Sequence, residues 1–368
     1  MDMEMKEFLG KTIAEMVAIA SPSGREEKMT EYVIARLKKD GLKAKRDADG
    51  NVWAEVGAGK RRLHANAHMD TVVAGDGWKG DPLKARITGG RVYGLGSSDC
   101  KAGIAALLWL APRVKTRIRV VYSFTVCEEG VDLPKPNGSE KMAAMGGDWA
   151  VLCEPTCEAG VPLLGIGTQG HARADVRFRG EAAHSSRPED GRNAIYAAAR
   201  FCSELERLNG RFEEFEVAPG AAARATVAAT IIRGGTLSNV IPDAAEVTVS
   251  RRLAPGETRK TFRMELDSLL EGADADYTVA SDGDGALTRR DGDLLRAAKA
   301  ASGRAGGKGR LAFARGRTDA IIFARHDMDT LTVGPGVMGQ CHVANEYVDL
   351  AGAVAAVRLL EELIGNLA

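Results

Sequence analysis

Acidic and histidine side chains follow several short apolar runs of this chain, in places where they could bind metal ions. His68 and Asp70 end the segment LHANAHMD. Residues two apart on a strand point to the same side, so Asp70 is placed to orient the His68 ring, as carboxylates often do beside metals. Taken alone, the pair is more typical of a structural histidine.

Further candidates lie in comparable places along the chain. Two adjacent acids at the end of a strand point in different directions, so one can bind a metal while the other faces the reaction space. Each candidate also has an ordinary interpretation, as a helix cap or as part of a solvated loop. They are Asp99 in the turn GLGSSDCKAG, Glu128 and Glu129 after VVYSFTVC, Glu154 after AVLC, and His342 in a glycine-rich loop.

Together these residues form a ligand set with consistent chemistry. Two histidines and several carboxylates give mixed nitrogen and oxygen donors, which suit zinc. The three charges of Asp99, Glu129 and Glu154, with one bridging hydroxide, would balance two Zn²⁺ ions, so the loaded site could be buried. Without metal, the same acids would repel one another.

The elements that would position these residues follow from periodicity. Residues 3–19 and 25–39 repeat apolar positions at helical spacing, and Ser23 is placed to cap the second helix. Short apolar runs separated by Gly/Asp loops predict strands of a sheet covered on both faces. Residues 167–283 instead follow the order strand, helix, strand, strand, helix, strand, which predicts a ferredoxin-like sandwich. We therefore expect a catalytic α/β domain at 1–166 and 284–368, interrupted by the inserted domain.

Length and composition agree with this organisation. The 368 residues exceed the roughly 250–300 at which one hydrophobic core stops growing. Lys+Arg and Asp+Glu are both 50, so no net charge attracts nucleic acid or an anionic membrane. The acidic, helix-like start and the lack of a long apolar run favour the cytoplasm and no membrane association. The six cysteines show no CxxC pair and no small disulfide scaffold.

The sequence contains the series H-x-D … D … E-E … E … H together with four longer motifs. These are the strings GHARADVRFRGEAAHSSRP, NVIPD, RRLAPGE and VGPG…HVANE. Over nearly its whole length, the chain resembles the family of acetylornithine deacetylase, succinyl-diaminopimelate desuccinylase and related co-catalytic zinc aminoacylases and carboxypeptidases. The resemblance implies a zinc-exopeptidase-like catalytic domain with helices on both faces of a mixed sheet. It also implies that the inserted domain is a lid through which a homodimer forms.

The resemblance assigns metal ligands residue by residue. It places His68 and Glu154 on one zinc, and Glu129 and His342 on the other. Asp99 would bridge both metals, often with a cis peptide bond to the residue that follows. Cobalt or manganese would fit the same donors.

The resemblance also assigns the remaining roles. Asp70 would orient the histidine ligand, and Glu128 would be the general base. His184 would reach into the active site of the partner subunit and stabilise the oxyanion. The expected substrate contacts are Arg252, which would bind a carboxylate, Asn239, Thr318 and Asn345.

Three functions stay open. The first is removal of the acyl group from a small N-acyl amino acid, which a Glu at position 154 favours within the family. The second is a dipeptidase or carboxypeptidase acting on a short peptide. The third is a non-catalytic protein that binds an amino acid or a metal, and Glu128 argues against it because a binding protein needs no base beside the metals.

Overall fold

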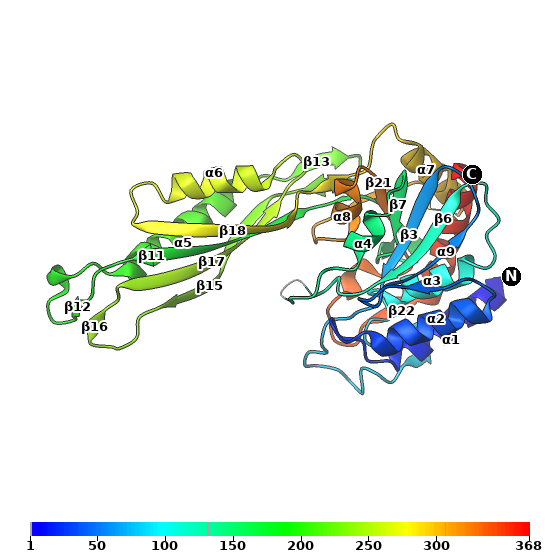
Figure 1. Ribbon diagram of the computed structural model, residues 1–368, viewed down its shortest axis with the longest axis horizontal. Coiled ribbons are helices and arrows are strands. Elements are labelled where there is room, and N and C mark those ends of the chain that lie inside the picture. Colours follow the sequence, from blue (N-terminus) through cyan, green and yellow to red (C-terminus); the bar gives the residue numbers. More distant parts are fainter. Residues whose placement is uncertain (1, 131–132, 306) are drawn as a thin grey trace. The chain divides into compact units, whose positions relative to one another are not determined.

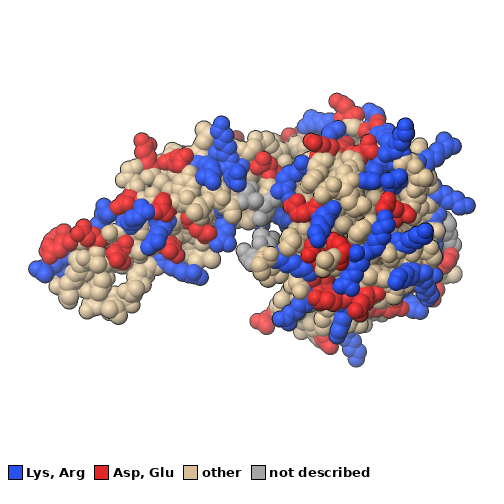
Figure 2. All heavy atoms as spheres, in the orientation of Figure 1, with Lys and Arg blue, Asp and Glu red and all other residues tan. Residues whose placement is uncertain are grey.

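The computed structural model describes residues 2–130, 133–305 and 307–368, and the chain divides into two compact units (Figure 1). Unit 1 comprises Met1–Gly167, Leu287–Ala312 and Thr318–Ala368. Unit 2 comprises Thr168–Ala286 and Phe313–Arg317. In both units, Lys/Arg and Asp/Glu side chains are intermixed over the face that Figure 2 shows.

A nine-stranded sheet forms the centre of unit 1. Strand β3 pairs in parallel with β6 and β7, and β7 pairs in parallel with β21, whereas β2 pairs with β6 in antiparallel fashion. The sheet is therefore mixed, as expected. In order, its strands are β1 (Lys45–Arg46), β2 (Val52–Val56), β6 (Arg119–Thr125), β3 (Arg62–His68), β7 (Trp149–Leu152), β21 (Asp329–Thr332), β10 (Leu164–Thr168) and β19 (Ala286–Leu287), with β20 (Leu311–Ala314) paired to β10.

Both faces of this sheet are covered. In β3 and β6 nearly every successive side chain is buried, which requires packing on both sides. Helices α1, α3, α7 and α9 pack against one another, while α4 and α8 pack together. The helices of the unit are α1 (Asp2–Val17), α2 (Glu27–Lys39), α3 (Lys101–Leu110), α4 (Ser139–Ala143), α7 (Asp293–Arg304), α8 (Ala320–Arg325) and α9 (Leu350–Leu367).

Smaller elements complete unit 1. Strands β4 (Arg86–Thr88), β5 (Arg91–Tyr93) and β22 (Tyr347–Asp349) form a three-stranded sheet, and β8 (Cys157–Glu158) pairs with β9 (Val161–Pro162). A 3₁₀ turn spans Met338–Gln340. Within the described segments, no helix is both long and apolar enough to span a bilayer.

The predicted cap of the second helix was wrong. The N-cap of α2 is Glu26, and no side chain caps it by a hydrogen bond. Ser23 lies too far ahead of Glu27 to reach the first N–H groups of the helix. Its hydroxyl instead donates a 2.7 Å hydrogen bond to Asp70 Oδ2, so it supports the candidate site.

Unit 2 has the predicted order of elements. Its antiparallel sheet, in the order β15-β17-β11-β18, carries α5 and α6 on one face (Figure 1). Strand β11 alternates buried and exposed residues, and the buried ones, Phe178 among them, pack in one core with Phe201 and Phe262. The elements are β11 (Gly170–Arg179), α5 (Ala194–Arg211), β15 (Thr226–Gly234), β17 (Ala244–Leu253), α6 (Arg259–Leu269) and β18 (Ala275–Gly283).

Two small two-stranded sheets and one turn extend unit 2. Strand β12 (Ala183–His184) pairs with β16 (Val240–Ile241), and β13 (Phe215–Ala218) pairs with β14 (Ala221–Ala223). A 3₁₀ turn spans Pro188–Asp190.

One histidine in the sheet of unit 1 is buried in its neutral form. His64 is 0% exposed, and its Nε2 lies 3.0 Å from the carbonyl oxygen of Gly146. Nδ1 has no hydrogen-bond partner among the described residues. Burial lowers the pKa of His64 from 6.5 to about 4.

We expect His64→Phe to make the protein less sensitive to acid. Because the folded pKa lies below the unfolded one, the neutral ring stabilises the fold above pH 6.5, and this stabilisation is lost as the pH falls toward 4. Between pH 7 and pH 5, the loss is about 2 kcal/mol. Urea unfolding of the metal-free wild type and variant at both pH values measures it. An equal drop in the free energy of unfolding of the two proteins between pH 7 and pH 5 would contradict the prediction.

Candidate metal centre

The candidate residues of unit 1 gather because three neighbouring strands end together. Strands β3, β6 and β7 are parallel, with His68 opposite Thr125 in the register. His68 is the last residue of β3, Glu128 and Glu129 follow β6, and Glu154 follows β7. The carboxyl ends of parallel strands are where ligands bind in open α/β sheets.

Asp99 lies between the two candidate histidines. Its Oδ1 is 3.0 Å from His68 Nε2, and its Oδ2 is 3.6 Å from His342 Nε2. The same nitrogen of His342 lies 2.6 Å from Glu129 Oε1. One carboxylate thus presents an oxygen to each histidine, which is the arrangement a bridging ligand needs. Ligand atoms of Asp99, Glu129 and His342 lie within 4.8 Å of one another, as do those of His68, Glu128 and Glu129.

Glu154 adds a further carboxylate near this group. Burial raises the pKa of Glu154 to about 8, and the carboxylates of Asp99 and Glu129 add to the effect. Among the described residues, Glu154 belongs to none of the three-residue groups whose ligand atoms lie within 4.8 Å. Mutually repelling carboxylates beside two imidazoles fit divalent cations bound by nitrogen and oxygen donors.

Cys100 is unsuited to serve as a ligand, although its sulfur lies near His68 and Asp99. Its Sγ donates to the carbonyl oxygen of Cys153 at 3.1 Å. Burial raises the pKa of the Cys100 thiol well above its usual value, which keeps the proton on sulfur. The Asp99–Cys100 peptide bond is cis, as expected. All six cysteines are free thiols.

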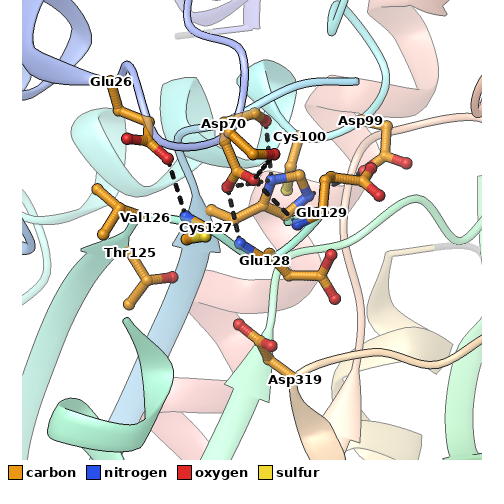
Figure 3. A network of polar contacts seen from close by, with 12 residues as sticks. Glu26, Asp70, Asp99, Cys100, Thr125, Val126, Cys127, Glu128, Glu129 and Asp319 are labelled. Carbon is orange, nitrogen blue, oxygen red and sulfur yellow. Dashed lines mark hydrogen bonds and ion pairs between the residues drawn. The ribbon is translucent and has the colours of Figure 1, made fainter. Parts of the chain in front are cut away.

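Asp70 connects His68 to the two glutamates, and Figure 3 shows Asp70 next to Glu128 and Glu129. His68 Nδ1 lies 3.0 Å from the Asp70 carbonyl oxygen and 3.5 Å from its Oδ1, which leaves Nε2 to face Asp99. The Asp70 carboxylate accepts hydrogen bonds from the backbone N–H of Glu128 at 3.0 Å and of Glu129 at 2.9 Å. The backbone carbonyl of Asp70 therefore holds the ring by a hydrogen bond, and its carboxylate fixes the backbone that carries both acids.

We expect Asp70→Asn to weaken metal binding about 10–100-fold, because an amide cannot accept all of these hydrogen bonds. Zinc affinity measured by chelator competition tests this. Ser23→Ala is the comparison variant, since it removes one partner of Asp70 and leaves the contacts with His68 and the glutamates, and its loss of zinc affinity should be smaller than that of Asp70→Asn. Wild-type affinity in Asp70→Asn would show that the contacts do not matter for the metals.

The two adjacent glutamates point in different directions. Figure 3 shows the Glu129 carboxylate turned toward Asp99 and the Glu128 carboxylate farther from Asp99, between Glu129 and Asp319 in this view. Glu128 is 7% exposed. Asp319 in turn accepts hydrogen bonds from Asn137 Nδ2 at 2.7 Å and from Ser139 Oγ at 2.5 Å. Glu128 is thus placed beside the metal candidates His68 and Glu129.

Two predicted substrate contacts of unit 1 make local hydrogen bonds. The Thr318 hydroxyl accepts from the N–H of Ala320 at 3.3 Å. The Asn345 side chain accepts from the N–H of Lys79 at 2.8 Å and donates to the carbonyl oxygen of Gly77 at 3.1 Å. These contacts fix loops, and the role of both residues in substrate binding stays a prediction.

Sequence reasoning missed Glu346, which follows Asn345 directly. This carboxylate is 2% exposed and accepts hydrogen bonds from the turn that carries Asp99. Burial raises its pKa to about 7. The only available signal was its place at the end of the string HVANE, which does not reveal a buried carboxylate.

The candidates of unit 2 fall into two places. His184 on β12 is exposed, and its Nδ1 lies 2.8 Å from Ser186 Oγ. Asn239 is next to it, because its carbonyl oxygen accepts from the N–H of Ser185 at 2.9 Å. Arg252 lies near the other end of β17, opposite His171 in the register. The structure brings His184 and Asn239 together, and it does not bring Arg252 to them.

The model of the peptidase family M20/M25/M40 matches residues 64–366. The chain belongs to this family. A putative succinyl-diaminopimelate desuccinylase from Mycobacterium tuberculosis is 30% identical over 362 residues, which covers 96% of this chain and 97% of the relative. An acetylornithine deacetylase from Myxococcus xanthus is 28% identical over 384 residues and covers 97% of each chain.

A solved structure from Bacillus subtilis, described as a dinuclear metal binding peptidase of the M20 family, shares the fold. It superimposes with a TM-score of 0.73 at 17% identity and covers 98% of each chain. The mixed sheet and its helices are therefore those of an M20 peptidase. The protein is a metal-dependent hydrolase of an amide or peptide bond.

Proposed function

We propose that this M20 hydrolase removes the acyl group from a small N-acyl amino acid with two zinc ions. The observation that supports it most strongly is Asp99, whose two oxygens face His68 and His342 separately. In this proposal His68 and Glu154 would hold one zinc, Glu129 and His342 would hold the other, and Asp99 would be a ligand of both. Cobalt or manganese would fit the same donors.

In the proposed reaction, the carboxylate of Glu128 transfers a proton from water to the leaving amine. Zinc, when bound, lowers the pKa of water toward about 7 and polarises the substrate carbonyl. A carboxylate oxygen of Glu128 accepts the proton of the attacking water and later delivers it to the nitrogen of the leaving amine. Its carboxylate lies beside His68 and Glu129 and is not one of the proposed ligands, so it is available for this transfer.

We also propose a homodimer in which His184 serves the site of the partner subunit. Strand β15 is the edge of its sheet, and Ile231 and Ile232 on it are 45% and 55% exposed. A long edge strand with exposed apolar residues is suited to pair with a second copy.

The separation of the two ends of β17 favours placing His184 in the site of the partner subunit. His184 and Asn239 lie beyond the Ala244 end of the strand, whereas Arg252 is eight positions further on, or about 27 Å. A small substrate cannot span that distance. One substrate would therefore contact Arg252 of one chain and His184 and Asn239 of its partner.

Arg252 is proposed to bind the substrate carboxylate with both arms of its guanidinium group. We expect Arg252→Lys to raise KM because lysine cannot form the planar, bidentate contact. Steady-state kinetics measures this, with Arg177→Lys on the neighbouring strand β11 as an exposed control. An unchanged KM in Arg252→Lys would exclude this contact.

A dipeptidase or carboxypeptidase acting on a short peptide is the alternative, since the family description and the Bacillus subtilis structure both name peptidases. Turnover of N-acetyl and N-succinyl amino acids against dipeptides, with metal content measured, separates the two. We expect the acyl amino acids to be hydrolysed faster. Faster hydrolysis of dipeptides would favour the peptidase, and bound metal without any turnover would favour a binding protein.

The cytoplasm stays the proposed location, and six free thiols suit its reducing conditions.

A further inference from the structure

The turn that carries Asp99 is held by a carboxylate from a distant part of the chain. Glu346 Oε2 accepts a hydrogen bond from the N–H of Gly96 at 2.7 Å. Its Oε1 accepts from the N–H of Ser98 at 2.7 Å and from the N–H of Asp99 at 2.9 Å. With 2% of its surface exposed, Glu346 makes these contacts away from water. One side chain thus fixes the backbone of the bridging candidate.

A buried lysine holds the opposite groups of the same turn. Lys101 is 1% exposed, and its Nζ donates to the carbonyl oxygens of Leu95 and Ile19, both at 3.2 Å. Glu346 also interacts electrostatically with this ammonium group. The turn is therefore held from two sides: the Glu346 carboxylate accepts from its N–H groups, and the Lys101 ammonium group donates to one of its carbonyl oxygens.

The turn has little space to move. Gly96 has φ +74°, and a Cβ atom built on it would lie 2.5 Å from Thr71 Cγ2. The backbone of Glu346 adds another restraint, because its carbonyl oxygen accepts from the N–H of Gly94 at 3.0 Å. His342 lies four residues before Glu346, so one short segment supplies one candidate ligand and fixes another.

We propose that Glu346 is a positioning residue of the metal centre, which sets the Asp99 carboxylate between the two metals. This inference rests on the proposed two-metal site. Metal–ligand distances tolerate only about ±0.2 Å, so a small shift of the Asp99 backbone disturbs both metals at once. Loss of such outer partners typically lowers metal affinity about 10–100-fold.

The test uses two substitutions that separate shape from charge. Glu346→Gln keeps the shape, but its amide N–H₂ cannot accept from the turn. Glu346→Asp keeps the negative charge, but its shorter side chain cannot reach all three N–H groups. The matched control is Asp349→Ala, because Asp349 also accepts backbone N–H groups, of Ala351 at 2.9 Å and Gly352 at 3.3 Å, but only at the start of α9.

The readouts are the affinity for Zn²⁺, by chelator competition, and the visible absorption of the Co²⁺-loaded protein. We expect about 10–100-fold weaker Zn²⁺ binding and an altered Co²⁺ spectrum in both Glu346 variants. The control should keep the wild-type spectrum and the wild-type affinity. If Glu346→Gln does not fold, Glu346→Asp decides by the same criterion.

Two results would overturn the inference while leaving the proposed function intact. In the first, the wild type binds two metals and the folded Glu346 variants bind Zn²⁺ as tightly as the wild type does. The other is an equal loss of affinity in Asp349→Ala, which would show that the effect comes from general destabilisation. A wild type that binds no Zn²⁺ would instead overturn the proposed function together with this inference.

Discussion

Replacing Glu128 with glutamine is expected to lower kcat about 10²–10⁴-fold while both metals stay bound, because the amide cannot accept the proton of the attacking water. The contact between Glu128 and Asp70 is made by the backbone N–H and survives the change. Glutamine keeps the shape of the side chain, so the neighbouring candidates His68 and Glu129 should not move. Steady-state kinetics and the metal content of the same samples measure both effects.

Glu140→Gln is the matched control for this experiment. Glu140 is partly exposed and forms an ion pair with Arg325, outside the metal centre. Its kcat and metal content should equal those of the wild type. If Glu128→Gln keeps a wild-type kcat, Glu128 is not the general base. If the variant loses metal, Glu128 is a ligand instead.

The second large effect is expected from His184, whose removal should lower kcat about 10²–10³-fold through loss of an oxyanion donor. Its assignment to the partner's site makes a sharper prediction. A heterodimer of one Glu128→Gln chain and one His184→Ala chain contains one complete site and one that lacks both groups. Such a heterodimer, purified with two different tags, should recover about half of the wild-type activity.

The reciprocal heterodimer is the control. It pairs a wild-type chain with a chain that carries both Glu128→Gln and His184→Ala. If His184 acts in the partner's site, neither of its sites is complete and it should be nearly inactive. If His184 acts within its own chain, this heterodimer should be half active and the first one inactive. A monomer with full activity would remove the basis for both expectations.

The order of elements in unit 2 can be predicted because each element carries its own periodicity. Strand β11 alternates buried and exposed residues along its ten positions. The two helices are amphipathic, and together with the strands they allow few arrangements. The hairpin of β13 and β14 is harder to predict, because Ala221–Ala223 has no alternation and only the Pro219-Gly220 turn marks it.

The grouping of the metal candidates can also be predicted in part. Acids that directly follow parallel strands must meet at one edge of the sheet, and this holds for Glu129 and Glu154. The position of His342 depends instead on the resemblance to the family. It lies in an irregular loop at φ 59°, which no periodicity describes.

The supporting residues could not be predicted from spacing. Glu346 accepts a hydrogen bond from Gly96, which lies 250 positions earlier in the chain. Ser23 donates one to Asp70, which lies 47 positions later. A carboxylate that accepts backbone N–H groups looks in sequence like any other acid in a polar loop. The position of Ser23 instead predicts a helix cap, because a serine shortly before an amphipathic segment favours that role.

The most direct test of the central claim is anomalous X-ray diffraction at the zinc edge from crystals of the zinc-loaded protein. We predict two peaks on either side of the Asp99 carboxylate, one beside His68 and Glu154 and the other beside Glu129 and His342. A single peak away from Asp99, or zinc bound only at other residues, would contradict the two-metal site and the mechanism built on it.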